Sequence, residues 1–256
     1  MLRMPSTTHN AFLYSLTDEI WDQLKALTTS VEEAQNAKPM PWGFEFPGLK
    51  KKYPDGAFGS REKKYPRLVI EIANSQSRKN LNDLAYTYIQ ASKGRIRTVL
   101  AVDLEYRPPA KRSMGHISNA VYSIYRLHIE TGPDGRTVRR VKVDVENRPF
   151  RFDGDTPDGN LVLKLSDVLS ISPSADINDP TISISHNDLT AFLAEAEAYQ
   201  AIADSPTNPH CSEDEMVEGF PDATSQHVSE PEEVTAEDMM AFQKQVDASE
   251  QMRDER

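Results

Sequence analysis

The residues best suited to chemistry in this sequence are two carboxylates, Asp55 and Glu71. Asp55 follows a proline, and Glu71 lies inside the apolar run from Leu68 to Ile72. A carboxylate in such a run is costly to bury unless it is paired, hydrogen-bonded or bound to a metal ion. Two carboxylates with a backbone carbonyl form the hard oxygen site that suits Mg²⁺ or Mn²⁺. An ion held there activates water and stabilises charge on a phosphate that is being transferred.

Asp55 by itself carries little information, because the triplet Pro-Asp-Gly occurs three times, at 54–56, 133–135 and 157–159. Proline and glycine suit turn positions and aspartate bonds to the local backbone, so the second and third copies are typical of hairpin turns. The first copy differs because the apolar run with Glu71 and then an amphipathic segment follow it. This pairing, and not the triplet, indicates a site.

The segments around Glu71 predict a strand, a helix and a second strand. Residues 67–73 are rich in β-branched side chains and predict a buried strand, and residues 96–104 predict another. Between them, residues 77–92 place five apolar side chains on one helical stripe, namely Leu81, Leu84, Ala85, Tyr88 and Ile89. If the two strands are parallel, this is a βαβ unit with the helix covering one face of the sheet.

The flanking segments extend this unit to a mixed α/β body. A helix is predicted over residues 15–35, capped by Ser15 or Thr17, and a final amphipathic helix over residues 186–201. Two alternating runs, 121–130 and 137–145, flank a Gly-Pro-Asp-Gly turn and predict a hairpin, and residues 160–165 form a third run. We therefore expect one domain over residues 1–203.

The acidic excess of the chain lies in its C-terminal part. The whole chain has 40 acidic and 29 basic residues; residues 205–256 hold 14 and 3 of them, which leaves 26 of each sign in residues 1–204. This tail buries too little apolar surface to offset its ordering entropy, so we expect residues 204–256 to be mostly disordered. The tail is either a solvated extension or a segment that binds a protein partner or inhibits the chain by mimicking a polyanion.

Composition excludes several classes of protein. No stretch approaches the about 20 consecutive apolar residues that a spanning helix needs, so a membrane protein is not expected. The N-terminus lacks the apolar segment of a secretory signal, and the single cysteine, Cys211, excludes an intramolecular disulfide. These features predict an intracellular protein and leave nucleus and cytoplasm open.

A run of basic residues surrounds the first Pro-Asp pair. Between residues 50 and 67 only Asp55 and Glu62 oppose seven cations, namely Lys50, Lys51, Lys52, Arg61, Lys63, Lys64 and Arg67. Such a run is either a solvated surface or an electrostatic footprint for phosphate, and its position beside Asp55 favours the second interpretation. We therefore expect nucleic acid as a partner of these side chains.

The segment from residue 53 to residue 106 resembles the core of the PD-(D/E)XK nuclease superfamily, which includes restriction-type endonucleases. The resemblance is carried by Pro54-Asp55, the strand Leu-Val-Ile-Glu71-Ile-Ala, the helix after Asn-Ser-Gln-Ser, and the strand Val-Leu-Ala-Val-Asp. More narrowly, Ile-Glu-Ile-Ala-Asn-Ser-Gln-Ser with Leu81, Asp83 and Ala85 resembles a group of fungal proteins of that superfamily. The resemblance implies a restriction-endonuclease-like core, in which a central mixed β-sheet is flanked by helices.

The resemblance also implies a metal site. Asp55 and Glu71 would bind Mg²⁺ or Mn²⁺, with the backbone carbonyl of Ile72 as a third ligand. In that superfamily an acidic residue of the first helix often joins them, and the candidates in this sequence are Glu19, Glu32 and Glu33.

One position departs from the superfamily pattern. The lysine expected two positions after the strand carboxylate, which positions water and stabilises charge on the phosphate, is replaced by Ala73. Three interpretations remain open: Lys79 on the next helix reaches the site, Gln76 orients the water, or the site is inactive. The sequence thus predicts a metal-dependent nuclease or phosphodiesterase acting on nucleic acid. The alternative is a catalytically inactive nuclease-like module that binds nucleic acid or protein.

Overall fold

The computed structural model describes residues 6–27, 32–40, 43, 45, 53–60, 62–74, 78–105, 118–132, 135–169 and 179–205. The chain divides into two units, residues 1–208 and 209–256, and every described residue belongs to the first. From residue 206 onward, the tail predicted to be disordered therefore lies outside the described residues. The same holds for five residues of the predicted sites, namely Lys50, Lys51, Lys52, Arg61 and Gln76.

Within the described residues, a mixed sheet of six strands has the order β1-β2-β3-β4-β5-β6. The strands are β1 (Ala37–Pro39), β2 (Gly56–Ser60), β3 (Leu68–Asn74), β4 (Thr98–Leu104), β5 (Ala120–Thr131) and β6 (Thr137–Arg151). β3 and β4 run parallel, and every other neighbouring pair runs antiparallel. A second, two-stranded antiparallel sheet is formed by β7 (Asn160–Lys164) and β8 (Thr181–Ser185).

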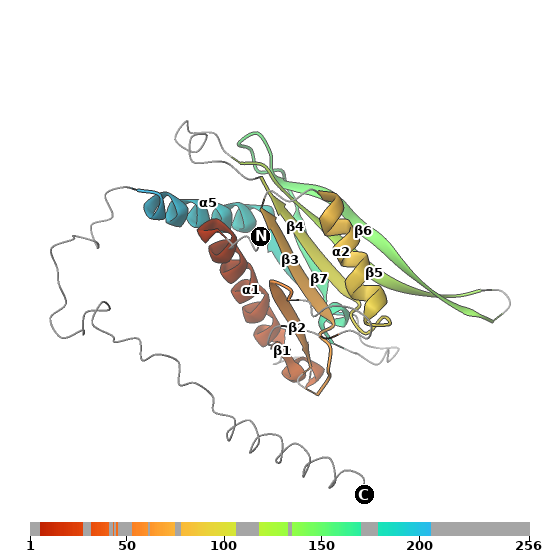
Figure 1. The fold of residues 1–256 in the computed structure, drawn as a ribbon. Helices are drawn as coiled ribbons and strands as arrows, with labels where there is room; N and C mark the ends of the chain where they lie inside the picture. The colour runs from red at the N-terminus through yellow and green to blue at the C-terminus, as the bar shows by residue number, and fades with distance from the viewer. Residues whose placement is uncertain are drawn as a thin grey trace, which may run out of the picture. The chain divides into compact units, whose positions relative to one another are not determined.

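Helices cover both faces of the six-stranded sheet (Figure 1). α2 (Arg78–Ala91) connects β3 to β4 and packs on one face. α1 (Thr7–Leu27), α5 (His186–Ala203) and the β7–β8 sheet pack on the other. Two short helices are η1 (Glu32–Asn36) and α4 (Leu165–Val168). In the part of the chain that the structure describes, no helix is long and apolar enough to cross a membrane.

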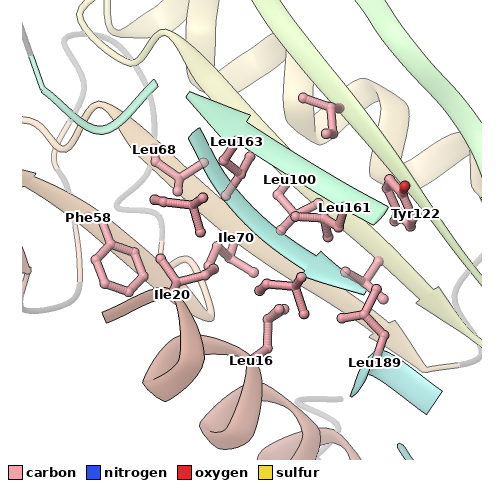
Figure 2. Close-up of a cluster of buried hydrophobic side chains, with 14 of the residues drawn as sticks. Leu16, Ile20, Phe58, Leu68, Ile70, Leu100, Tyr122, Leu161, Leu163 and Leu189 are labelled. Carbon is pink, nitrogen blue, oxygen red and sulfur yellow. The ribbon is translucent and has the colours of Figure 1, made fainter. Parts of the chain in front are cut away.

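The larger apolar core lies between the six-stranded sheet and the layer of α1 and β7–β8. Figure 2 shows side chains of these layers facing one another, among them Leu16, Ile20, Ile70, Leu100, Leu161 and Leu163. Strand alternation separates this core from the one under α2, because Leu68, Ile70 and Ile72 of β3 face the larger core. Val69 and Ala73 face α2, and this alternation places Glu71 on the α2 face as well.

The predicted strand, helix and strand around Glu71 are confirmed. The bounds of β3, α2 and β4 lie within two residues of the predicted ones, and β3 and β4 are parallel. The β5–β6 hairpin, the strand β7 and the final helix α5 also form where the patterns predict them. The chain is therefore an α/β protein with a mixed central sheet.

The prediction for the first helix is wrong by eight residues at each end. α1 begins at Thr7, where the Ser6 Oγ accepts a hydrogen bond from the His9 N–H at 3.2 Å. Thr17, a predicted cap, lies within the helix, and its hydroxyl donates to the Leu13 carbonyl at 2.8 Å. The earlier start adds two turns and brings His9 into the buried stripe of α1, which comprises His9, Phe12, Leu16, Ile20 and Leu24.

Sequence patterns do not predict β1, β2 or β8. The segment of β2, Gly-Ala-Phe-Gly-Ser, is short and contains two glycines, and four of its five residues are buried, so it shows no alternation. Pairing with β3 forms this strand, because strand propensity depends strongly on tertiary context. β2 matters for the site because Asp55 directly precedes it.

Candidate functional site

Asp55 lies immediately before β2 and extends the pairing of β2 with β3 through its side chain. The Oδ2 of Asp55 accepts a hydrogen bond from the Ile72 N–H at 2.7 Å. The backbone register of the two strands ends with Gly56 opposite Ile70. The carboxylate therefore acts on β3 as a backbone carbonyl of a longer strand would, and this bond fixes its orientation.

Glu71 is held from the helix side of the sheet. Its Oε1 accepts a hydrogen bond from the Tyr88 hydroxyl at 2.6 Å. Tyr88 belongs to α2 and is only 1% exposed, in the apolar cluster that includes Val69 and Ala73 of β3. A buried phenol thus orients the carboxylate that the sequence places inside an apolar strand.

The two carboxylates act on a common neighbour, the Tyr88 hydroxyl. Burial raises the pKa of Tyr88 above its ordinary value, the charge and hydrogen bond of Glu71 raise it further, and the charge of Asp55 adds to this. The last pair in the register of β2 and β3 is Gly56 with Ile70, and continuing this register by one residue sets Asp55 opposite Glu71. Asp55 and Glu71 therefore both lie near the Tyr88 hydroxyl, at the end of the sheet where β2 begins.

His9 reaches Asp55 from α1. Its Nε2 lies 3.2 Å from Asp55 Oδ2, and its Nδ1 lies 3.2 Å from Asn10 Oδ1. Burial opposes the charged imidazolium, but the hydrogen bond and charge of Asp55 raise the pKa of His9 above its ordinary value. Hydrogen bonds to Asn10 and to the Ile72 backbone act in the same direction. The imidazole thus contacts two of the three groups that the resemblance implies as metal ligands.

The residue at the position expected to carry a lysine is buried. Ala73 is 3% exposed and packs under α2, and its neighbour in β4 is Asp103. Of the two candidate replacements, Lys79 lies in the first turn of α2, which follows the carboxyl end of β3, and its side chain is outside the described part. Gln76 lies wholly outside the described residues, so its role as a water-orienting group stays a prediction.

Glu19, one of the three candidates for the acidic residue of the first helix, lies on α1. Glu19 accepts a hydrogen bond from Gln23 at 2.7 Å and lines a groove between α1 and α5. Glu32 and Glu33 lie in η1, and the structure does not describe their side chains. Because α1 starts earlier than predicted, the helix residue that contacts Asp55 is His9.

The described part of the basic run lies away from the carboxylates. Lys63 and Lys64 lie in the loop between β2 and β3, and Arg67 directly precedes β3. Glu71 follows Arg67 by four residues, which corresponds to about 13 Å along a strand. These three cations are close to Asp55 in the sequence, but β2 carries the chain from Asp55 to the opposite end of the sheet before it reaches them.

The donor set suits a divalent ion held by few protein ligands. Mg²⁺ is commonly bound by one or two carboxylates, while water and substrate phosphate complete its shell. Asp55, Glu71 and the Ile72 carbonyl supply oxygen donors of this kind. Among the described side chains no group of three or more His, Cys, Asp or Glu is placed to hold an ion.

Sequence patterns do not identify His9 and Tyr88 as site residues. Tyr88 is predicted only as part of the stripe of the helix over residues 77–92, and His9 precedes the predicted start of the first helix. The available signal is a polar atom within a buried helical stripe, because buried polar groups require partners. In the structure these partners are Asp55 and Glu71.

Comparison with protein-family models and with curated proteins finds no match to this chain. The PD-(D/E)XK superfamily therefore stays a resemblance, carried by residues 53–106.

Proposed function

We propose that this chain is a divalent-metal-dependent phosphodiesterase that cleaves nucleic acid, built on a restriction-endonuclease-like core. The observation that carries the proposal is that Asp55, just before β2, and Glu71 of β3 both act on the Tyr88 hydroxyl, and that each accepts a hydrogen bond from the protein. Carboxylates that are oriented in advance by neighbouring groups are suited to bind an ion, because little reorganisation is needed.

The order of elements supports the proposal. α1 precedes Pro54-Asp55, β3 carries Glu71, α2 follows, and β4 returns parallel to β3. The resemblance places its helix, acidic strand, helix and second strand in this order. A parallel βαβ unit also gathers loops at the carboxyl ends of its strands, where ligands of α/β proteins commonly bind.

The residues of the site have distinct tasks in this proposal. Asp55, Glu71 and the carbonyl of Ile72 hold Mg²⁺ or Mn²⁺, while Tyr88 fixes the Glu71 carboxylate and His9 fixes that of Asp55. The bound ion supplies Lewis acidity toward a phosphate oxygen and lowers the pKa of a bound water. These partly buried contacts keep both carboxylates in place before an ion or a substrate arrives.

The group that orients the attacking water comes from outside β3. Ala73 offers no polar atom beyond its backbone, and it is buried under α2. Gln76 and Lys79 follow the carboxyl end of β3 in the sequence, so we assign this task to one of them.

The buried Ala73 also favours a second candidate function, a nuclease-like module that binds nucleic acid or a protein and does not cut. A chain that lacks the water-orienting group retains its fold and its charged surfaces. This candidate differs from the first in one observable property, because it binds without cleavage under every divalent ion.

Cleavage by the full-length chain tests the proposal. We expect labelled single- or double-stranded DNA or RNA to be cut in Mg²⁺ or Mn²⁺, since the ion contributes several kcal/mol of charge stabilisation. Chelation should abolish cleavage, and excess Mg²⁺ should restore it. Cleavage that ignores the chelator would contradict the metal dependence. Binding without cleavage in either ion would replace the proposal by the inactive module.

A further inference from the structure

We propose that a second site on this chain, separate from the carboxylates, holds the phosphate backbone of nucleic acid. The site is a cavity of about 950 Å³ at the amino ends of β3 and β4. Its walls carry seven cations, namely Lys63, Lys64, Arg67, Lys93, Arg95, Arg97 and Arg139, and Glu62 is the one carboxylate among its described lining residues. The choice of nucleic acid as the ligand rests on the proposed function, whereas the site itself rests on this geometry.

The cations of the cavity act on one another. Among the described residues, the Arg97 side chain has no hydrogen-bond or ion-pair partner; burial lowers the pKa of Arg97, and the charge of Arg139 lowers it further. Burial and the charge of Arg97 also lower the pKa of Arg67, while Asp167 and Asp179 oppose this. Like charges gathered in one place destabilise a fold, and a bound polyanion relieves the repulsion.

Backbone carbonyls hold two of these guanidinium groups in place. The Nε of Arg67 donates to the Ser166 carbonyl at 2.7 Å, and the Nη1 of Arg139 donates to the Lys93 carbonyl at 3.4 Å. A carbonyl orients a guanidinium without cancelling its charge. The fold thus positions cations from separate segments around one space, as a binding site for an anion requires.

The cavity is suited to phosphates and not to bases. Tyr65 is the one aromatic side chain among its described lining residues, and it is only 6% exposed. Lys64 Nζ and the Arg95 guanidinium each lie 5.5 Å from the centre of its ring, and its hydroxyl donates to the Glu45 carbonyl at 2.9 Å. Base stacking needs an accessible aromatic face, so binding here depends on charge and is independent of base sequence.

The cavity is large and lies apart from the proposed ion. Its volume of about 950 Å³ is near the upper end of the roughly 300–1,000 Å³ of typical ligand pockets. This volume is larger than a single phosphate group occupies. Arg67 on its wall lies about 13 Å along β3 from Glu71. A nucleic acid bound here is therefore held at a distance from the bond to be cut.

Fluorescence anisotropy with a labelled DNA oligonucleotide, in the presence of a chelator, tests this inference on the full-length chain. For the double variant Arg97→Gln with Arg139→Gln we expect at least about tenfold weaker binding at low salt. The slope of log affinity against log salt should fall by about one for each cation removed. The matched control is Arg140→Gln with Lys142→Gln on β6, because both cations pair with Glu130 and neither lines the cavity. The control should bind like the wild type.

Two outcomes would overturn the cavity as the binding site. One is unchanged affinity in the Arg97 and Arg139 double variant; the other is an equal loss in the control, which would show that net charge alone decides binding. Inorganic polyphosphate serves as a competitor of the same chemistry. If it binds while the oligonucleotide does not, the assignment of nucleic acid is wrong.

The variant Glu71→Gln separates this inference from the proposed function. It should bind the oligonucleotide like the wild type and fail to cut it. Normal binding by the cavity variant, together with lost cleavage by Glu71→Gln, overturns the cavity alone. If the cavity variant binds more weakly than the wild type, and the wild type never cuts, the proposed function alone is overturned.

Discussion

Replacing Glu71 by glutamine is expected to lower metal-dependent cleavage by at least about 100-fold. The carboxylate supplies charge to an ion whose effect on the transition state is several kcal/mol, and about 1.4 kcal/mol corresponds to tenfold in rate. Glutamine keeps an oxygen that accepts the Tyr88 hydroxyl, whose hydrogen bond measures 2.6 Å. The free energy of unfolding should therefore change by less than about 1 kcal/mol. Single-turnover cleavage and denaturant unfolding measure the two quantities.

The variant Glu146→Gln is the matched control for this substitution. Glu146 lies on β6 and is exposed. Its replacement by glutamine changes the charge by the same amount as Glu71→Gln, at a position that does not contact the site. It should cut at the wild-type rate. If Glu71→Gln also cuts at that rate while it remains folded, Glu71 does not hold the ion and the assignment of the site is wrong.

Replacing Asp167 by asparagine is expected to lower the free energy of unfolding by about 3–5 kcal/mol, as breaking a buried charge pair does. The side chain of Asp167 is only 5% exposed and joins α4 to β4 and β5. Its oxygens accept from Thr98 at 2.7 Å, from two nitrogens of Arg126 at 2.9 and 2.8 Å, and from the Lys164 N–H at 2.8 Å. In asparagine, one of the two acceptor oxygens that face these donors is replaced by an NH2 group, which is itself a donor. The substitution also leaves Arg126 without its main counter-charge.

The effect of Asp167→Asn should depend on pH. Burial raises the pKa of the Asp167 carboxyl, but the hydrogen bonds and charge of Arg126, with Lys164 and Thr98, hold the pKa below its ordinary value. Such a group stabilises the fold above its unfolded pKa of about 3.9, and this stabilisation is lost as pH falls through the lower folded pKa. The difference between wild type and variant should be complete at neutral pH and should shrink below about pH 4.

The variant Asp144→Asn is the control for this prediction, because Asp144 binds the same guanidinium. Its oxygen lies 3.1 Å from Arg126 Nη1, and its side chain is 25% exposed. A more exposed pair of this kind contributes about 1 kcal/mol or less. Denaturant unfolding at several pH values measures both variants. Equal losses for Asp144→Asn and Asp167→Asn would contradict the central role given to the buried carboxylate.

The centre of the fold was predictable because its patterns are local and strong. The β-branched run of β3 and the single stripe of α2 each have one periodicity, and the parallel pairing of β3 with β4 follows from their connection through a helix. β2 was not predictable, because Gly-Ala-Phe-Gly-Ser has neither alternation nor strand-forming composition and forms through its partner. The start of α1 was misplaced because Ser6, Ser15 and Thr17 are all of residue types that favour N-caps.

The candidate site was predictable only in its carboxylates. Glu71 stands out because a charge inside an apolar strand needs a reason, and Asp55 stands out through its place before that strand. Their partners come from α1 and α2, since His9 contacts Asp55 and Tyr88 contacts Glu71. These contacts depend on how the helices pack on the sheet, and no local pattern encodes that packing.

The basic residues illustrate the same limit. Lys63, Lys64 and Arg67 are close to Asp55 in the sequence, but the direction of β2 moves them to the far end of the sheet. There they join Arg97 and Arg139, which are distant in the sequence, around one cavity. The structure thus separates these cations from the two carboxylates, which the sequence alone presents side by side.

Titration calorimetry with Mg²⁺ and Mn²⁺ tests the central claim, that Asp55 and Glu71 form an ion site, most directly. The measurement compares the full-length wild type with Asp55→Asn and Glu71→Gln, each with and without a nucleic-acid oligonucleotide. The account predicts binding by the wild type that both substitutions abolish. The absence of binding by the folded wild type in both conditions, or binding that survives both substitutions, would contradict it.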